Sequence, residues 1–537
     1  MILRIHIALA ITTLVLSCSS DSPDESRSND RQQTPAQAPP TETPKEPPVE
    51  IAPLLPLPVP QAYFGELDGL TRLGEPLNVK RTKGNSVVLV VFDTLNARHL
   101  GVYGYSRDTS PGIDSLSQEG LVLTNYISNS SWTRPSMATI MTGLPKKKHK
   151  LELNCPPMSE DITTLAERFK KAGYRTAGFV GNPLIKAKWG FGQGFDTYVD
   201  AKVLQNYKLA DDADLAKRAI SWLEKNGDQP FFLFVFFTAP HSPYSPPKGF
   251  GKFFKGLPKG WPIRIPRREY PGGMDPGDRA WTVAAYDGDV LYGDAQLRKL
   301  IAHLKKTGLF ETTTVAVTAD HGEIFGEHNC FMHSYHMWEP VLRVPFVISS
   351  PALPVKGAYD DRPFTHLDIA PTLLDLVGID LRSHDLVGKS MAQVFEDPRS
   401  GRERELFSQY NAHDLRRETI REGRWKLVHH HPVPFSATRT LNMFGHTNKV
   451  PPKPGDLPTV SWEVEKYELF DLESDPGELQ DLFESRKTEA QTVDLISALA
   501  KHLEDNPDKK IEMDEDLKKA LGALGYIGLA DDDKKDD

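Results

Sequence analysis

Three strongly apolar runs of the chain are each followed by residues that could bind a cation. Asp93 follows SVVLVVF, the pair Asp320-His321 follows TTVAVTA, and His241 comes soon after PFFLFVFF. Carboxylate and imidazole ligands together suit Zn²⁺, Mn²⁺ or Mg²⁺, and suit Ca²⁺ less well because of the histidine. A single Asp-His pair is usually structural. The prediction of a metal site therefore depends on Asp93, Asp320 and His321 lying together.

The segment SNSSWTRPSMATIMTG places Thr133 at the expected start of a helix that ends at Gly143. Pro135 fits the first helical turn, where its missing N–H costs nothing. Thr133 is open to two interpretations, a helix N-cap or a nucleophile, and the local sequence by itself favours the cap. A threonine hydroxyl needs a metal or a base to remove its proton. A cation held by Asp93, Asp320 and His321 could do this, and the amides of a helix start would stabilise the resulting anion.

The elements that must position these residues alternate between buried strands and amphipathic helices. β-branched or aromatic runs without polar alternation are typical of strands buried on both faces. Such strands alternating with helices predict an α/β fold, with a mostly parallel sheet sandwiched between helices. Ligands of such sheets gather beyond the carboxyl ends of the strands. The predicted strands are 86–93, 176–183, 230–240 and 313–320, and the predicted helices are 209–227 and 292–308.

Several motifs, in order, resemble the sulfatase family of the alkaline phosphatase superfamily over nearly all of 87–482. They begin with VVFDTLNARHLGVYGYSRDTSPGIDSL, SWTRPSMATIMTG and LPKKKH, and continue with TADHGEIFGEHNCFMHSYHMWEPVLRVPFVI, HLDIAPTLLDLVGI and YELFDLESDPGELQDL. The resemblance implies the alkaline-phosphatase-like fold, with a smaller C-terminal α+β domain. It also implies an enzyme that hydrolyses esters with the help of a divalent metal ion, which could be Ca²⁺, Mn²⁺, Zn²⁺ or Mg²⁺.

The resemblance implies a role for each matching residue. Asp93, Asp320 and His321 fall on the metal ligands, Thr133 falls on the nucleophile, and His241 falls on a histidine near the ester oxygens. His333 lies twelve residues after His321, the spacing of a substrate-binding histidine in the related phosphoethanolamine transferases, which also use threonine. The predicted catalytic residues are Thr133, His241 and His333, and the predicted substrate-binding residues are Lys148, His149, Asn182 and His336.

One departure from the family affects the chemistry. Sulfatases that hydrolyse by the usual route carry Cys or Ser in C/S-x-P-S-R, which is matured to formylglycine, whereas this chain has T-R-P-S-M. Threonine cannot form that aldehyde hydrate, and Met137 replaces the supporting arginine. The sequence predicts instead that Thr133 attacks sulfur or phosphorus, and that water activated by His241 or His333 then cleaves the threonyl ester.

The substrate class stays open at this point, as does the type of activity. The favoured function is hydrolysis of a sulfate, phosphate or phosphonate ester, such as a sulfated glycan or a phosphodiester. The alternatives are transfer of a phospho group to a glycan or lipid, and glycan binding by a degenerate sulfatase fold. A formal net charge of −9 argues against nucleic acid as a partner.

The N-terminus indicates export. Arg4, a short apolar run and Leu16-Ser17-Cys18 are typical of a signal peptide with a lipobox, in which Cys18 would be lipidated. The prediction is a lipid-anchored protein of the bacterial cell envelope, without a transmembrane helix. The predicted organisation is a signal peptide at 1–18, a Pro-rich tether and linker at 19–82, a catalytic domain at 83–395, a C-terminal domain at 396–528 and a charged tail at 529–537.

Two smaller questions concern cysteine and histidine. In an oxidising compartment Cys155 and Cys330 could pair, but two independent buried thiols are equally consistent with the sequence. The run His429 to His431 suggests a metal site, yet its place in the smaller domain favours histidines that are exposed or lie on the rim of a pocket.

Overall fold

A computed structural model describes residues 64, 67 and 69–503, with gaps at 153–154, 201–210, 258–275, 335, 398–399, 402, 413–414 and 432–464. The predicted signal peptide, Cys18, most of the tether and the charged tail lie outside the described residues. In the part of the chain that is described, no helix is both long enough and apolar enough to cross a membrane.

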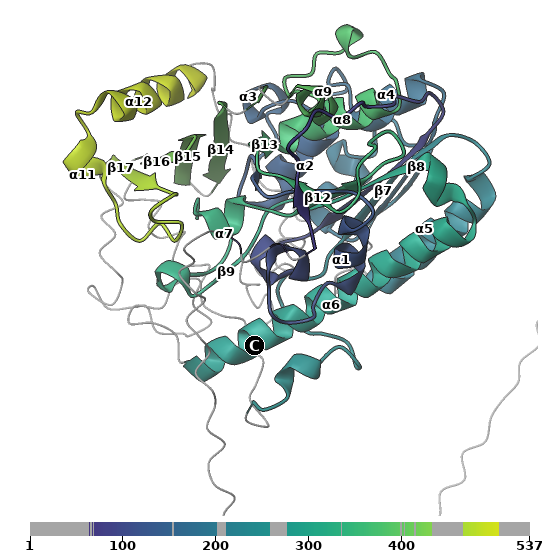
Figure 1. The fold of residues 1–537 in the computed structure, drawn as a ribbon, viewed down its shortest axis with the longest axis horizontal. Helices are drawn as coiled ribbons and strands as arrows, with labels where there is room; N and C mark the ends of the chain where they lie inside the picture. The colour runs from purple at the N-terminus through teal and green to yellow at the C-terminus, as the bar shows by residue number, and fades with distance from the viewer. Residues whose placement is uncertain are drawn as a thin grey trace, which may run out of the picture. The chain divides into compact units, whose positions relative to one another are not determined.

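The main element is a nine-stranded, mostly parallel sheet (Figure 1). This sheet and the helices that cover it confirm the predicted α/β fold class. All neighbouring strands are parallel except β11, which runs antiparallel to both of its neighbours. In sheet order the strands are β1 (Thr71–Arg72), β12 (Ala358–Asp360), β3 (Leu121–Leu123), β11 (Phe346–Ser349), β8 (Thr313–Ala319), β2 (Ser86–Phe92), β7 (Phe231–Phe237), β5 (Arg175–Val180) and β6 (Thr197–Val199).

The four strands predicted from apolar runs form the middle of this sheet as β8, β2, β7 and β5. Every residue of β2, β7 and β8 is buried, as expected for strands covered by helices on both faces. The edge strand β1 adds a finding, because Thr71 and Arg72 belong to the sheet although the sequence assigned them to the linker.

Helices cover both faces of the sheet (Figure 1). One group packs together as α1 (Pro111–Ser117), α5 (Asp212–Asn226) and the long α6 (Pro276–Lys306). The other group is α2 (Thr133–Thr142), α4 (Leu165–Lys171), α8 (Ile369–Leu376) and α9 (Met391–Glu396). The predicted helices correspond to α5 and to the C-terminal half of α6.

Shorter elements complete the main body of the protein, the part of the chain built around the nine-stranded sheet. Two small sheets pair β4 (Tyr126–Ile127) with β13 (Phe364–Thr365), and β9 (Ile324–Phe325) with β10 (Phe331–Met332). Short α-helices are α3 (Lys146–His149) and α7 (Glu339–Leu342). The 3₁₀ turns are Ala97–His99, Gly101–Tyr103, Pro183–Ile185, Ala187–Trp189, Lys252–Phe254, Leu309–Thr312, Glu327–Asn329, His366–Asp368 and Leu381–Ser383.

A separate antiparallel sheet forms the C-terminal region, as the sequence predicts. It consists of β14 (Glu405–Ala412), β15 (Leu415–Glu422), β16 (Trp425–His430) and β17 (Lys466–Asp471), followed by α11 (Phe483–Arg486) and α12 (Ala490–Leu503). One face contributes to the same hydrophobic core as the nine-stranded sheet, through Leu406, Tyr410, Leu415, Val428 and Phe470. The other face packs on α12, where Ile420, Leu427 and Leu469 of the sheet meet Leu495 and Leu499 of the helix.

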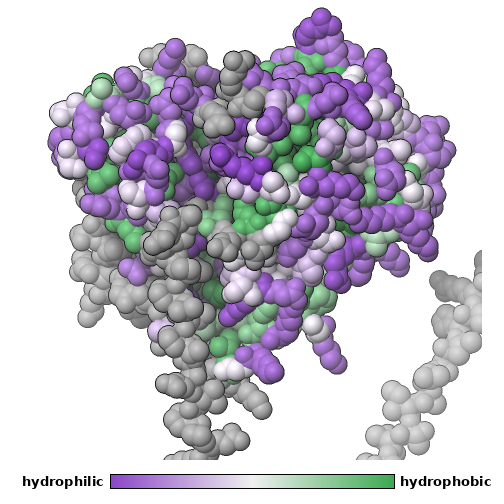
Figure 2. Space-filling model, viewed as in Figure 1, coloured by the Kyte–Doolittle hydropathy of each residue, from purple (hydrophilic) through white to green (hydrophobic). Residues whose placement is uncertain are grey.

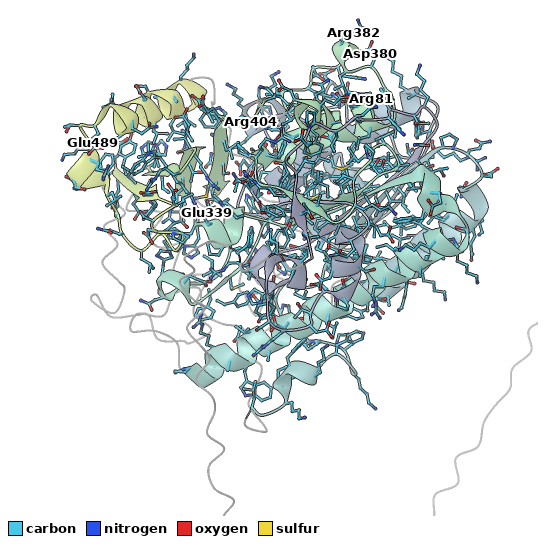
Figure 3. The ribbon with its side chains drawn as sticks, in the orientation of Figure 1. Arg81, Glu339, Asp380, Arg382, Arg404 and Glu489 are labelled. Carbon is cyan, nitrogen blue, oxygen red and sulfur yellow. The ribbon has the colours of Figure 1, made fainter. Side chains whose placement is uncertain are left out.

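Buried ion pairs connect this sheet to the main body of the protein around Glu339 in α7, which Figure 3 labels. Glu339 accepts from Arg421 at 3.0 Å and from Lys426 at 3.1 Å, and Lys426 also lies 2.6 Å from Glu478. Burial alone would raise the pKa of Glu339, but the surrounding cations lower it well below its usual range. Removing one partner of such a buried network leaves an uncompensated charge.

The described residues expose few large apolar side chains, and the two cysteines among them are buried. The face shown in Figure 2 is mainly hydrophilic, with apolar residues in small, separated patches. Among the described residues, the exposed large hydrophobic side chains are Val387, Leu479 and Val493. Cys155 and Cys330 are both buried free thiols, so the possible disulfide between them is not formed.

Candidate active site

The central strands bring the predicted ligands to one edge of the sheet. In the parallel register, Phe92 of β2 lies beside Ala319 of β8 and Phe237 of β7. The ladder continues one residue further, because the Asp320 N–H donates to the Phe92 carbonyl at 3.2 Å and the Asp93 N–H to the Phe237 carbonyl at 3.0 Å. The carboxyl ends of three neighbouring strands therefore place Asp93 and Asp320 side by side.

Asp93, Asp320 and His321 form a compact buried group, here named the acidic trio. One ligand atom of each lies within 4.8 Å of those of the other two, and all three residues are fully buried. Burial and the neighbouring Asp320 raise the pKa of Asp93 well above its usual value. Burial also raises the pKa of Asp320, with His321 opposing that shift. Two desolvated carboxylates this close are costly unless a cation neutralises them.

The hydrogen bonds of the trio leave oxygen atoms available for a cation. Asp93 Oδ2 accepts from Asn182 Nδ2 at 2.6 Å, while Asp93 Oδ1 has no hydrogen-bond partner among the described residues. Asp320 Oδ1 accepts from the backbone N–H groups of Thr94 at 3.1 Å and His321 at 2.7 Å. An orphaned carboxylate oxygen beside a second carboxylate and an imidazole fits the donor set of a divalent metal.

The orientation of His321 is fixed by its own backbone. Nδ1 lies 3.0 Å from the Gly322 carbonyl, which can only accept, so Nδ1 carries the proton. Nε2 is left with its lone pair, 3.5 Å from Asp320 Oδ2 and 3.5 Å from Thr133 Oγ1. Burial lowers the pKa of His321, which keeps the ring in the neutral form that can bind a metal.

Thr133 is not the N-cap that the local sequence favours. Helix α2 begins at Thr133, and the cap position belongs to Trp132, whose backbone is extended and whose side chain makes no capping bond. The Thr133 hydroxyl is fully buried and its hydrogen-bond contact is His321 Nε2. The helix ends as predicted at Gly143, in the left-handed conformation that glycine favours. The structure thus directs the hydroxyl of Thr133 at the trio.

Ser128, in the loop before α2, hydrogen-bonds the backbone at Asp320, directly after β8. Its Oγ lies 2.6 Å from the Asp320 carbonyl, 3.0 Å from Ser136 Oγ and 3.4 Å from His366 Nδ1. His366 is buried, and burial lowers its pKa to about 3, so it acts as a neutral support. These contacts hold the start of α2 in a fixed position relative to the trio.

Two further histidine rings lie near His321 at the site, and one of them contacts both of the others. The His333 ring is 4.4 Å from that of His321 and 5.2 Å from that of His241. His333 Nδ1 lies 3.0 Å from Glu323 Oε1, and Tyr244 donates to Glu323 Oε2 at 2.8 Å. Glu323 is a positioning residue that the sequence analysis missed, although it stands inside the metal motif as the last residue of DHGE.

Glu323→Gln is expected to lower kcat on the order of 100-fold, the contribution of a positioned acid or base. The substitution removes the carboxylate that holds the His333 ring, while Tyr244→Phe removes one hydrogen bond but keeps that charge. We expect Tyr244→Phe to cost clearly less and Glu323→Asp to recover part of the loss. Steady-state kinetics of the three variants test this, and equal effects of Glu323→Gln and Tyr244→Phe would contradict a specific role of the carboxylate.

The predicted substrate-binding residues occupy different environments. Asn182 holds Asp93 through Nδ2 and accepts from the Leu184 N–H through Oδ1, so both ends of its amide are used inside the protein. Lys148 is exposed on α3. His149 is buried, with Nε2 3.2 Å from Thr139 Oγ1 and Nδ1 accepting from the Leu151 N–H at 3.1 Å.

The remaining residue of this set, His336, is buried and stacks on Trp338 with the ring centroids 4.9 Å apart. Trp338 also stacks on His328, at 3.8 Å. Of these four predicted substrate-binding residues, Asn182 hydrogen-bonds the metal-ligand candidate Asp93. Both ring nitrogens of His149 are already occupied by contacts inside the protein, which is typical of a structural histidine.

A pH test distinguishes a structural His149 from a cationic binding residue. Burial, and then Lys146, lower the pKa of His149 to about 3, whereas an unfolded histidine titrates near 6.5. Between those pH values the unfolded chain binds the extra proton, so this group contributes stability above pH 6.5 that is lost as the pH falls. Glutamine does not titrate, so the stability of the His149→Gln variant lacks this dependence on pH. We expect urea unfolding to show that wild type is more stable than the variant at pH 7.5, and that this difference in unfolding free energy narrows by up to about 3 kcal/mol at pH 4.5. A constant gap would contradict the neutral buried ring.

Comparison with known families agrees with this fold. The family model described as Sulfatase matches residues 85–379, and the model described as N-sulphoglucosamine sulphohydrolase, C-terminal, matches residues 326–437. With the mostly parallel sheet, these matches define an ester hydrolase of the alkaline phosphatase superfamily. The chain belongs to the sulfatase family.

Individual relatives are distant but cover most of the chain. An N-acetylglucosamine-6-O-sulfatase of Bacteroides thetaiotaomicron is 22% identical, over 80% of this chain and 89% of the relative. A protein solved in complex with its substrate D-glucosamine-2-N,6-O-disulfate aligns with a TM-score of 0.62, at 20% identity, over 79% of this chain and 98% of that protein. The phosphonate monoester hydrolase of Agrobacterium radiobacter aligns with a TM-score of 0.61, at 19% identity, over 80% and 98%. These structures show that the fold is shared.

Proposed function

We propose that the chain hydrolyses sulfate esters through a covalent intermediate on Thr133. The observation that carries this proposal is the buried Thr133 hydroxyl, which makes no helix cap and lies 3.5 Å from His321 Nε2 within a group of two carboxylates and one imidazole. The first residues of α2 add backbone N–H groups that favour an anion at this position.

The proposed reaction has two displacement steps. Thr133 Oγ1 attacks the sulfur, the bond from sulfur to the substrate oxygen breaks, and that oxygen leaves with a proton. Water then attacks the same sulfur, the bond to Thr133 Oγ1 breaks, and the hydroxyl regains a proton. His241 and His333 supply and accept these protons, since the His333 ring lies beside His321 and the His241 ring lies beside His333.

A divalent cation bound by Asp93, Asp320 and His321 would stabilise negative charge on the attacking oxygen and on the sulfuryl group. The donor set includes an imidazole, so Zn²⁺ and Mn²⁺ fit it better than Ca²⁺. Asn182 and the backbone N–H groups of Thr94 and His321 orient the carboxylates for that role.

The route through Thr133 replaces the formylglycine route. Threonine carries a methyl group on Cβ, so oxidation cannot give the aldehyde hydrate. Met137, at the position of the usual arginine, is fully buried in the apolar core. The nucleophile in this proposal is therefore the unmodified side chain.

We propose a sulfated glycan as the substrate class. The support comes from relatives whose names specify sulfated sugars, including an N-acetylglucosamine-6-O-sulfatase and a Δ4,5-hexuronate-2-O-sulfatase. Phosphonate and phosphate esters are the second candidate, because an unmodified alkoxide attacks phosphorus by the same geometry and a phosphonate monoester hydrolase shares the fold.

The decisive experiment joins a substrate panel to mass spectrometry. The purified chain is incubated with aryl sulfates, sulfated oligosaccharides, phosphate monoesters, phosphodiesters and phosphonate esters, and is then quenched and digested. The proposal predicts turnover of a sulfate ester and a sulfuryl adduct on the peptide carrying Thr133. A phospho adduct would favour the second candidate, and consumption only in the presence of an acceptor sugar or lipid would indicate a transferase. Glycan binding without turnover would overturn hydrolysis.

We also propose that Cys18 anchors the chain in the cell envelope through lipid, on the evidence of the N-terminal sequence. Cys18→Ser is expected to move the protein from the membrane fraction to the soluble fraction on export. Cell fractionation with immunodetection measures this, and an unchanged distribution would contradict the anchor.

A further inference from the structure

A second group of potential metal ligands lies on the C-terminal sheet, outside the active site. It consists of Glu418 on β15, His429 on β16, and His431 directly after β16. Glu418 pairs with His429 in the antiparallel register, and the His431 N–H continues the ladder by donating to the Arg416 carbonyl at 3.1 Å. Because side chains alternate along a strand, all three project from the same face of the sheet.

That face is the one on which α12 packs, and it is opposite to the face that joins the catalytic core. Ile420 and Leu427 follow the same alternation as Glu418 and His429, and both pack against α12. Val428, which alternates with them, belongs to the core of the catalytic domain. The group named above therefore lies on the face of the C-terminal sheet that is turned away from the catalytic core.

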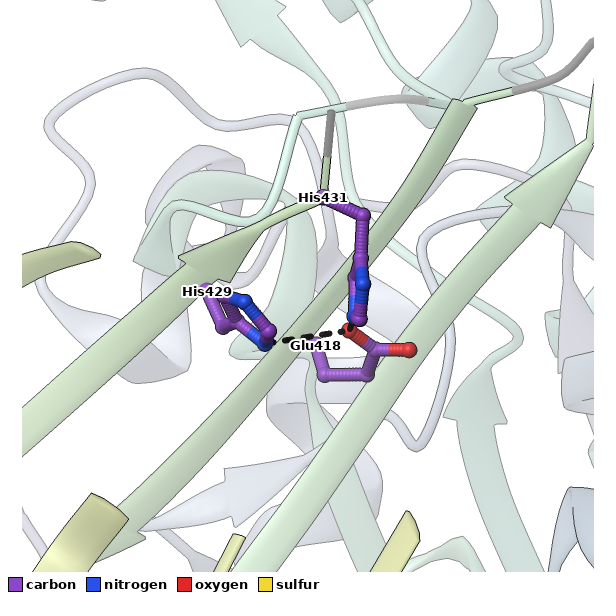
Figure 4. A group of neighbouring side chains, drawn as sticks. All are labelled: Glu418, His429 and His431. Carbon is purple, nitrogen blue, oxygen red and sulfur yellow. Dashed lines mark hydrogen bonds and ion pairs between the residues drawn. The ribbon is translucent and has the colours of Figure 1, made fainter. Parts of the chain in front are cut away.

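Three potential metal-ligand atoms lie close together, as Figure 4 shows, and both imidazole rings are directed at the Glu418 carboxylate. Glu418 Oε2 lies 2.5 Å from His431 Nε2 and 3.9 Å from His429 Nδ1, and the donor atoms all lie within 4.8 Å of one another. The side chains of Glu418 and His429 are buried and that of His431 is 25% exposed, which leaves an entry path. The expectation of exposed or rim histidines was therefore wrong for His429.

The surrounding contacts select the donor atoms. Glu465 Oε1 lies 2.7 Å from His429 Nε2, so that nitrogen donates and Nδ1 keeps its lone pair toward Glu418. Arg416 donates to Glu418 Oε1, which leaves Oε2 for the two histidines. Tyr467 stacks on the His429 ring at 4.3 Å and fixes its plane. A histidine bonded to a carboxylate on its far nitrogen is the common arrangement around bound metal ions.

We propose that Glu418, His429 and His431 bind a divalent transition metal of the Zn²⁺ class. Two imidazoles and one carboxylate are a frequent zinc donor set, and water can occupy the fourth position at the exposed side. Mg²⁺ and Ca²⁺ prefer sites built from oxygen alone. The bound ion links β15 to β16 beside the end of α12, and so stabilises the C-terminal sheet.

The test uses the full chain with the acidic trio inactivated by Asp93→Asn and Asp320→Asn, so that it does not depend on the proposed function. After removal of metal with a chelator, Zn²⁺ binding is measured by elemental analysis and calorimetry. We expect one equivalent of Zn²⁺ per chain, and the visible spectrum of four-coordinate Co²⁺ when Co²⁺ replaces it. Zn²⁺ should also raise Tm.

Adding His431→Gln to this background should weaken Zn²⁺ affinity on the order of 100-fold and abolish the rise in Tm. Losing a direct ligand should cost at least as much affinity as losing a residue that only hydrogen-bonds a ligand. His430→Gln is the matched control, because its side chain points to the opposite face and bonds Glu468 at 2.9 Å. Less than stoichiometric Zn²⁺ in the background variant, or equal binding by the His431→Gln and His430→Gln variants, overturns the proposal. If His431→Gln does not fold, Glu418→Gln replaces it with the same two outcomes.

Discussion

Thr133→Ala is expected to abolish turnover of every substrate that the wild-type chain cleaves, by a factor of at least about 10⁴, as loss of a covalent nucleophile does. The substitution removes the oxygen atom that forms the proposed covalent ester, while Asp93, Asp320 and His321 stay in place. Metal content should therefore remain near that of the wild type. Steady-state kinetics and elemental analysis on the same preparation measure both.

Two variants make this result specific. Thr133→Ser keeps a hydroxyl at the start of α2 and should retain measurable turnover. Thr142→Ala removes another buried hydroxyl from the same helix, one that donates to the Ala138 carbonyl, and should affect stability more than kcat. A Thr133→Ala enzyme with activity close to that of the wild type would exclude the covalent scheme.

Asp93→Asn is expected to have opposite effects on function and on metal-free stability. It should lower both metal occupancy and activity, the latter by at least about 10³, because the transition-state charge loses its main electrostatic support. In the metal-free protein the same change should leave the unfolding temperature unchanged or higher. Burial and Asp320 raise the pKa of Asp93, so at neutral pH its ionised form costs folding free energy that the neutral amide does not.

The measurement compares thermal unfolding of wild type and variant with chelator and with added Zn²⁺ or Mn²⁺. Added metal should stabilise the wild type more than Asp93→Asn. Asp212→Asn is the control, since Asp212 is also buried but accepts hydrogen bonds from Thr238 and Ala239. It should lose stability without loss of metal at the trio. Equal metal content in wild type and Asp93→Asn would refute the ligand assignment.

The local sequence was sufficient for the strands of the central sheet. The runs that became β2, β7 and β8 are rich in β-branched and aromatic residues and are buried at every position, as is typical of strands covered on both faces. The same reasoning identified Asp93 and Asp320-His321 as residues at strand ends. It could not give the strand order β8, β2, β7, β5, because that order depends on contacts between segments far apart in the chain.

Thr133 and Glu323 show where local patterns were misleading or silent. A threonine before a helix is usually a cap, yet the chain enters α2 with an extended Trp132 at that position. Glu323 looks like any acidic residue until the fold places its carboxylate between His333 and Tyr244. Both roles depend on where a side chain points after the backbone is fixed.

The sequence by itself determined the fold class, the family and the chemical types at the site, since these follow from the periodicity of apolar residues and from short motifs. Only the tertiary structure decided which of those residues meet. It brought Asp93, Asp320, His321 and Thr133 within reach of one another, and it gave His149 the contacts of a structural residue. It also brought two histidines of one run, the buried His429 and the partly exposed His431, to face Glu418. The physical reason is that proximity between distant residues depends on strand order and register, which the packing of the whole chain sets.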